Sequence, residues 1–290
     1  MIEAVIGARL VAGMPAEAYH SRPAAHYSTL KLFRRSAAHA REAMLHPKDQ
    51  TEAQRFGTAF HAAVLEPATF AERYTVPPSA KDYGVDGNQD GTPSKRTKEG
   101  KAVWAAWEAE NKGTEILSRD DFDTINRMVD SVASHPIALE LLGAARFREA
   151  SLLWTDAEHG VECRSRLDLV CEWAGWTWIA DLKETRDASP AGFRRAVAQY
   201  DYHVQAAMYL DGLNAVAGER ERRWAWIAVE SEPPYAVAVH EPLPATLDQG
   251  HRDYRSFLAL YARAIHSGEW PAYPPDLHGL ELPRWARTEE

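Results

Sequence analysis

Residues 176–185, Trp-Thr-Trp-Ile-Ala-Asp-Leu-Lys-Glu-Thr, join an apolar, aromatic and β-branched run to charged residues at its end. Successive side chains of an extended strand point to opposite faces, so Asp181 and Lys183 share one face while Leu182 points into the core. Charged groups are costly to bury at such a place unless they are paired or bind a metal. This stretch alone therefore leaves two interpretations open: a strand-end ion pair, or a metal-dependent catalytic site.

A second strand-like stretch lies just upstream, at residues 161–173, and carries Asp168. Ala-Gly at 174–175 is a short turn signal, so the two strands are expected to pair as a hairpin. Counting back from the turn brings Asp168 close to Asp181, to within a residue of register. Two carboxylates beside a lysine would form an oxygen-ligand site that suits Mg²⁺ or Mn²⁺. Such a site can activate water and stabilise a phosphoryl-transfer transition state.

Two further motifs flank this pair in the chain. Residues 205–209, Gln-Ala-Ala-Met-Tyr, match a Q-x-x-x-Y pattern, and residues 57–61, Gly-Thr-Ala-Phe-His, match a G-x-x-x-H pattern. Together with Asp168 and residues 181–183, the set resembles the RecB-like branch of the PD-(D/E)XK nuclease superfamily. The resemblance is closest to phage and prophage exodeoxyribonuclease VIII, the RecE nuclease domain. It extends over roughly residues 15 to 275, and four motifs in the same order are far more specific than the D-x-K pattern alone.

The resemblance implies a mixed α/β (α+β) fold: a PD-(D/E)XK restriction-endonuclease-like core with a central mixed sheet flanked by helices. We predict one nuclease domain over residues 1–290. Within it, residues 1–145 are expected to be mostly helical, residues 146–270 to form the catalytic core, and residues 271–290 to form a tail. The apolar periodicity of the chain agrees with this fold. It predicts helices at residues 28–44, 96–111, 119–133, 202–216 and 245–267, a helix that follows residue 51, a short helix that ends at about residue 142, and a helix that follows residue 189. The predicted strands are residues 149–154, 161–173, 176–183, 223–230 and 235–241.

The resemblance also implies a role for each motif residue. Asp168 and Asp181 would be metal ligands, the Leu182 backbone carbonyl a third oxygen ligand, and His61 the ligand that completes the sphere. Lys183 would be the catalytic lysine. The metal would be Mg²⁺, with Mn²⁺ as an alternative that a histidine ligand tolerates. Without the resemblance, a lone histidine on an apolar helix face is more simply a core residue.

Other polar residues are candidates for secondary roles in the site or in DNA binding. Gln205 and Tyr209 would position the lysine or a DNA phosphate, and Thr185 is a secondary candidate for a hydrogen bond near the lysine. Glu149, at the head of a strand, is either a ligand to a second metal or a surface charge. Arg164 and Arg166, which share a strand face with Asp168, would either bind phosphate or balance the carboxylates. Other basic side chains that could contact the DNA backbone are Lys95, Arg96, Lys98 and Lys101, together with Arg34, Arg35 and Arg41 on the first long helix. For the cluster within the expected loop 77–100, a solvated charged loop remains an equal alternative.

The composition narrows the class of protein. A net charge of −9 over 290 residues argues against a general nucleic-acid coat protein, although a local basic channel can coexist with an acidic surface. Cys163 and Cys171 are too far apart on one strand to bridge readily and suit a reducing compartment. There is no apolar run of membrane-spanning length and no signal-peptide pattern. We therefore expect a cytoplasmic protein with no membrane partner.

The function implied by the resemblance is that of a metal-dependent exonuclease that digests linear double-stranded DNA from its ends, 5′ to 3′, in phage-type recombination. A RecT-type single-strand annealing protein and a ring-shaped homo-oligomer would accompany it. Two alternatives stay open: a single-strand or flap nuclease of the same fold, and a catalytically silent DNA-binding recombination subunit. The presence of Asp168, Asp181 and Lys183 counts against the silent subunit, and the lack of a His-Glu-x-x-His motif counts against another metallohydrolase.

Overall fold

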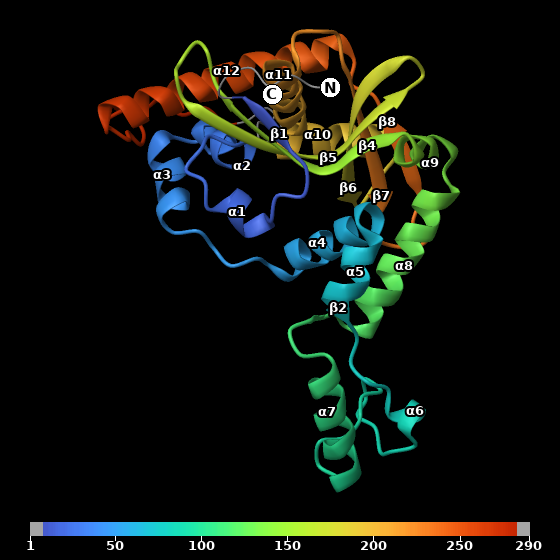
Figure 1. Ribbon diagram of the computed structural model, residues 1–290. Helices are drawn as coiled ribbons and strands as arrows, with labels where there is room; N and C mark the ends of the chain where they lie inside the picture. The colour runs from blue at the N-terminus through green and yellow to red at the C-terminus, as the bar shows by residue number, and fades with distance from the viewer. Residues whose placement is uncertain (1–7, 283–290) are drawn as a thin grey trace, which may run out of the picture.

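A central six-stranded sheet organises the structure, a computed structural model that describes residues 8–282 (Figure 1). The strand order is β1-β4-β5-β6-β7-β8, with β6 and β7 parallel and the other neighbours antiparallel. The strands are β1 (Arg9–Val11), β4 (Ala145–Thr155), β5 (Glu162–Trp173), β6 (Trp176–Thr185), β7 (Arg223–Glu230) and β8 (Val237–His240). This mixed sheet confirms the predicted fold class.

Helices cover both faces of the sheet. One face packs on α10 (Pro190–Tyr200), α11 (Tyr202–Ala217), α12 (Pro244–Ser267) and the N-terminal segment of α2 (Tyr27–Leu30), 3₁₀-helix η1 (Lys31–Arg34) and α3 (Ala37–Leu45). The other packs on α4 (Glu52–Leu65), α5 (Pro67–Arg73), α8 (Arg119–Ser134) and α9 (Pro136–Gly143). The short α1 (Ala16–His20) lies near the outer edge of the sheet (Figure 1). The sheet thus separates two apolar cores.

The β5–β6 hairpin sets the relative position of the two aspartates. Both turn residues have positive φ, 49° at Ala174 and 82° at Gly175, as a two-residue type I′ turn requires. Trp173 pairs with Trp176, and the register continues to Leu169 opposite Ala180. The ladder ends there, and Asp168 and Asp181 are the next residues of the two strands, so the hairpin brings them close together as the turn signal predicted.

The N-terminal half departs from expectation in two places. The helix expected over 28–44 is interrupted, because the Ser36 side chain accepts a hydrogen bond from the His39 backbone N–H and starts a new helix. The loop expected over 77–100 is also structured. It contains α6 (Ala80–Tyr83), and its basic segment leads into α7 (Lys98–Glu110). The short elements β1, α1 and α5 had no periodic signal.

Residues 76–114 form an arm that stands away from the rest of the molecule (Figure 1). Its base is closed by two short parallel strands, β2 (Tyr74–Thr75) and β3 (Glu115–Ile116). β2 directly follows α5, and β3 lies just before α8. None of the helices between residues 8 and 282 combines the length and the apolar character needed to cross a bilayer.

Candidate active site

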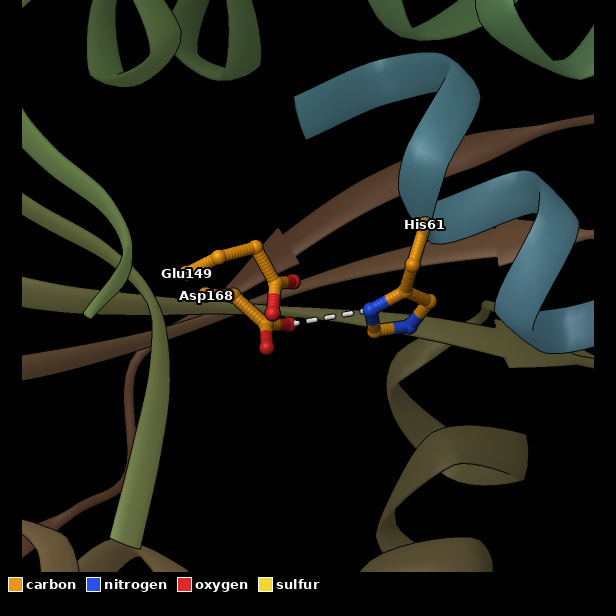
Figure 2. A group of neighbouring side chains, drawn as sticks. All are labelled: His61, Glu149 and Asp168. Atoms are coloured by element: carbon orange, nitrogen blue, oxygen red, sulfur yellow. Dashed lines mark ion pairs between the residues drawn. The ribbon is translucent and has the colours of Figure 1, made fainter. Parts of the chain in front are cut away.

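Asp168 and His61 meet at the junction of the sheet and α4. The Leu182 backbone N–H of β6 donates to Asp168 Oδ2 at 2.8 Å, which fixes the carboxylate on β5. His61 Nδ1 lies 3.5 Å from the same oxygen (Figure 2). α4 presents His61 because its buried face, with Phe60 and Leu65, packs on the sheet. The histidine of the G-x-x-x-H pattern therefore points at the aspartate of the hairpin.

Glu149 completes a three-residue group that we call the ligand cluster: His61, Glu149 and Asp168. One potential ligand atom from each lies within 4.8 Å of those of the other two, and the three side chains converge (Figure 2). Glu149 lies inside β4 rather than at its head. Its neighbours Arg148 and Ala150 pair with Leu169 and Leu167 of β5, so Glu149 faces Asp168 across the two strands. Its φ of 47° is left-handed, a conformation that costs a non-glycine residue on the order of 1–3 kcal/mol. The surface-charge interpretation of Glu149 is therefore wrong, and its backbone is held in a strained state beside the other two ligands.

Asp181 faces a different set of partners. Lys183 Nζ lies 2.6 Å from Asp181 Oδ2, and Gln205 Nε2 donates to Asp181 Oδ1 at 3.0 Å. Asp181 is only 1% exposed, so these contacts compensate a buried charge. The Q-x-x-x-Y helix thus holds the aspartate, whereas the sequence predicted that it positions the lysine or a phosphate. Tyr209, one turn later on α11, is buried against Trp224.

The site carries excess negative potential. Burial raises the pKa of Asp168 to about 7, and repulsion from Asp181 adds to the effect. Burial likewise raises the pKa of Glu149 to about 7, with Asp168 contributing and the Arg166 guanidinium opposing. These two carboxyl groups resist ionisation chiefly because they are buried and lie close to other carboxylates, and a bound cation would oppose both effects.

The pKa values of His61 and Lys183 shift in opposite directions. Burial and the neighbouring Lys183 ammonium lower the pKa of His61, so its imidazole is neutral at pH 7 and free to act as a ligand. A hydrogen bond to the Leu182 backbone opposes this shift. Burial tends to lower the pKa of Lys183, but attraction to Asp181 and Asp168 outweighs it and leaves the pKa raised. Lys183 is thus a fixed positive charge. One imidazole nitrogen and several carboxylate oxygens form a donor set that fits Mg²⁺ or Mn²⁺.

The two arginines of β5 have structural roles. Arg166 Nε lies 2.6 Å from Glu149 Oε2, and its Nη1 donates to the Met14 carbonyl at 3.2 Å, so it supports the ligand cluster. Arg164 is 4% exposed, donates to the Tyr19 carbonyl and lies 4.6 Å over the Tyr19 ring. This burial contradicts the phosphate contact predicted for Arg164.

Other residues that were predicted to contact DNA or the lysine have protein partners in the structure. Arg34 is bound by Asp201 and Asp253, both at 2.8 Å, which makes it a link between η1 and the α11–α12 pair rather than a free DNA contact. Thr185 exchanges hydrogen bonds with the Asp187 backbone instead of approaching the lysine. Arg35 Nε donates to the Tyr273 hydroxyl, and the Arg41 guanidinium lies over the Trp270 ring.

A pocket of about 390 Å³ opens onto the ligand cluster. Besides the cluster and Arg166 it is lined by residues that the sequence did not single out, among them His20 of α1 and Arg73 of α5. Neither lies in a motif, and only the tertiary arrangement of α1 and α5 brings them to this pocket. The pocket gives a substrate access to Asp168 from the side of α4.

Removing the Gln205 amide tests its positioning role. We expect Gln205→Leu to lower divalent-metal affinity by roughly 10–100-fold, because Asp181 would lose the donor that orients it. The matched control is Gln199→Leu, at an exposed position of α10. Calorimetric titration with Mn²⁺ would measure the affinity of each variant. Equal affinities for the two variants would show that Gln205 serves packing only.

Comparison with known proteins identifies the family. Residues 26–276 match the model of a PDDEXK-like domain of unknown function (DUF3799). No curated protein matches significantly. Among solved structures, a candidate exonuclease from Eubacterium rectale superposes with a TM-score of 0.59 at 12% identity, covering 93% of this chain and 95% of that chain. At this identity the likeness concerns the fold alone.

Two other structures match weakly. SSO0001 gives a TM-score of 0.27 at 15% identity, covering 54% of this chain and 69% of that chain. VC1899 from Vibrio cholerae gives 0.23 at 12% identity, covering 88% and 59%. Both scores are too low to support an argument about fold. The family model spans most of the chain and the site holds an aspartate pair and a lysine on adjacent strands: the chain belongs to the family of PDDEXK-like domains.

Proposed function

We propose that this protein is a metal-dependent nuclease that hydrolyses DNA phosphodiester bonds, acting as an exonuclease at the ends of linear duplexes. The observation that carries the proposal is the convergence of His61, Glu149 and Asp168 beside the buried Asp181–Lys183 pair. Family membership supports a nuclease, and the superposed Eubacterium rectale structure, which is described as a candidate exonuclease, favours the exonuclease form.

The residues divide the chemistry between them. The ligand cluster would hold Mg²⁺ or Mn²⁺, which supplies water activation and charge neutralisation when bound. Asp181 would contribute a further carboxylate, oriented by Gln205. Lys183, protonated and fixed by Asp181, would stabilise the negative charge that builds on the phosphate oxygens. Arg166 holds Glu149 in place, and Leu182 N–H holds Asp168.

The deciding assay offers linear duplex DNA and covalently closed circular DNA to the purified protein with Mg²⁺. We expect loss of the linear form only, and no loss when a chelator is present. Cutting of the circle would indicate an endonuclease, and digestion of single strands alone would favour the single-strand or flap alternative. Binding of ends without any cleavage would favour the silent-subunit alternative.

Finer features follow from the resemblance to exodeoxyribonuclease VIII and are proposed with it. The polarity would be 5′ to 3′, which 5′- and 3′-labelled duplexes distinguish. A role in phage-type recombination would require a RecT-type annealing partner, which co-purification would detect. A ring-shaped homo-oligomer would be visible in the mass measured by light scattering.

A further inference from the structure

The arm, residues 76–114, has a firmly anchored base. Besides the β2–β3 pairing, Thr75 Oγ1 donates to Asn111 Oδ1 at 2.9 Å, and Arg119 Nη2 donates to the Pro77 carbonyl at 3.0 Å. Because Asn111 ends α7 at the base, the first residue of α7 lies at the far end. Thirteen helical residues span about 20 Å. The arm therefore carries the start of α7 about 20 Å away from its base.

The far end of the arm is basic, and we call Lys95, Arg96, Lys98 and Lys101 the arm tip. All four are exposed. Lys95 is paired with Glu108 at 3.2 Å, and no ion pair of the other three occurs within the described residues. Residues 95–101 hold these four basic residues and one acidic residue, Glu99, whereas the chain as a whole has a net charge of −9, so the positive charge is a local feature of the tip.

The conformation of this basic segment is fixed by the arm's own packing. Trp104 Nε1 donates to the Pro93 carbonyl at 2.8 Å, and the Lys95 ammonium lies 4.2 Å from the centre of the Trp104 ring. A Cβ on Gly100 would lie only 2.1 Å from the Ser94 carbonyl oxygen, so the segment sits directly against the first turn of α7. The tip charges thus stand on an ordered scaffold, which reduces the entropy lost on binding.

The arm also leaves the body at the edge of the active-site pocket. Arg73 lines that pocket, and β2 begins at the next residue. A second pocket, of about 780 Å³, borders the arm base, and its lining includes one basic residue, Arg55, and five acidic ones, Glu52, Glu115, Asp121, Glu184 and Glu232. A polyanion would be repelled from the acidic residues of this pocket and attracted to the basic residues of the arm tip.

We propose that the arm tip binds the phosphate backbone of duplex DNA whose end occupies the active-site pocket. This rests on the proposed function for the identity of the ligand. A span of about 20 Å corresponds to roughly six base pairs at 3.4 Å per step, so the tip would contact phosphates well inside the duplex. The contacts are with backbone charge and carry no sequence preference.

The test separates binding from catalysis. The triple variant Arg96→Gln/Lys98→Gln/Lys101→Gln is compared with Lys48→Gln/Arg127→Gln/Arg263→Gln, which removes the same charge at exposed sites outside the arm. Affinity for a 24-base-pair duplex is measured by fluorescence anisotropy across a salt series, with Ca²⁺ replacing Mg²⁺. Hydrolysis of bis-p-nitrophenyl phosphate, which is too small to reach the arm, reports on the active site.

The tip variant should bind the duplex about 10-fold or more weakly, with a salt slope reduced by about 2–3, because each lost phosphate contact removes about 0.9 from it. The control triple should retain most of the affinity, and both should hydrolyse the small diester as the unmodified protein does. Equal duplex affinity and slope for the two triples, or no duplex binding by the unmodified protein, would overturn the proposal. Failure of the unmodified protein to cleave any diester while it still binds duplex through the tip would instead refute the nuclease function alone.

Discussion

Replacing Lys183 with methionine is expected to lower the rate of DNA cleavage by at least about 10²-fold while the protein stays folded. Its ammonium is the positive charge nearest Asp181 and would stabilise the phosphate in the transition state, and losing one such group typically costs about 10²–10³ in turnover. Methionine keeps most of the apolar stem. Initial rates on end-labelled linear duplex would measure the effect.

The same substitution should have a metal-dependent effect on stability. Without Lys183, the buried carboxylate of Asp181 keeps only the Gln205 contact, and breaking a buried pair can cost up to about 3–5 kcal/mol. Added Mg²⁺ or Mn²⁺ should restore much of the melting temperature, because the cation replaces the lost charge. Glu184→Gln, on the next position of the strand, is the control and should cleave normally. Cleavage by the Lys183 variant within a few-fold of the unmodified rate would exclude the lysine from the chemistry.

Replacing Asp168 with asparagine should abolish metal-dependent cleavage and yet stabilise the metal-free protein. Asparagine can still accept the Leu182 N–H through its Oδ1, but it carries no charge. The pKa of Asp168 is raised to about 7 in the folded state by burial and by Asp181, against about 4 in an unfolded chain. Ionised Asp168 therefore opposes folding.

The sign of the pH dependence follows from linkage. A raised carboxyl pKa contributes stability that is fully present below about pH 4 and is lost as the pH rises to about 7. At pH 8 the metal-free Asp168→Asn variant should be more stable than the unmodified protein by roughly 1–3 kcal/mol, and the difference should shrink toward pH 4.

Denaturant unfolding at both pH values, with and without Mn²⁺, measures these effects. The unmodified protein should gain stability from Mn²⁺, and the variant should gain much less, since a ligand stabilises only the state that binds it. The control is Asp130→Asn, an exposed aspartate of α8. A variant that is less stable than the unmodified protein at pH 8 without metal would contradict the assigned electrostatics.

Local sequence determined the hairpin and its register. Ala174 and Gly175 adopt the left-handed conformations of a two-residue turn, and alternation along β5 and β6 then leaves one register that buries both apolar sets. Asp168 therefore lies close to Asp181 at the end of the ladder, and Lys183 contacts Asp181 from the same strand, as their spacing alone predicted. The resemblance implied that His61 would join Asp168 from a helix, and that Gln205 would position Lys183 or a phosphate, whereas in the structure Gln205 donates to Asp181.

Only the tertiary structure decided how the site is divided. Leu167 packs in the core beneath α11 while Leu169, two residues on, packs in the opposite core, so alternation along β5 changes phase at Asp168. This change occurs opposite Glu149, whose left-handed backbone turns its carboxylate toward His61. Strict alternation predicts neither, because the irregularity is stabilised by distant segments: His61 of α4 faces the carboxylates, and Arg166, which pairs with Glu149, is held by the Met14 carbonyl.

The roles of the two arginines of β5 were also decided by the tertiary structure. Arg164 and Arg166 have equivalent positions in the alternation of β5, yet one is buried on Tyr19 and the other supports Glu149. Their roles depend on α1, which had no periodic signal of its own. Sequence by itself determined which charged groups this protein brings to one edge of the hairpin. The packing of distant segments decided which of them pair with each other and which are left to bind a cation, because the cost of burying each charge depends on neighbours that only the folded chain provides.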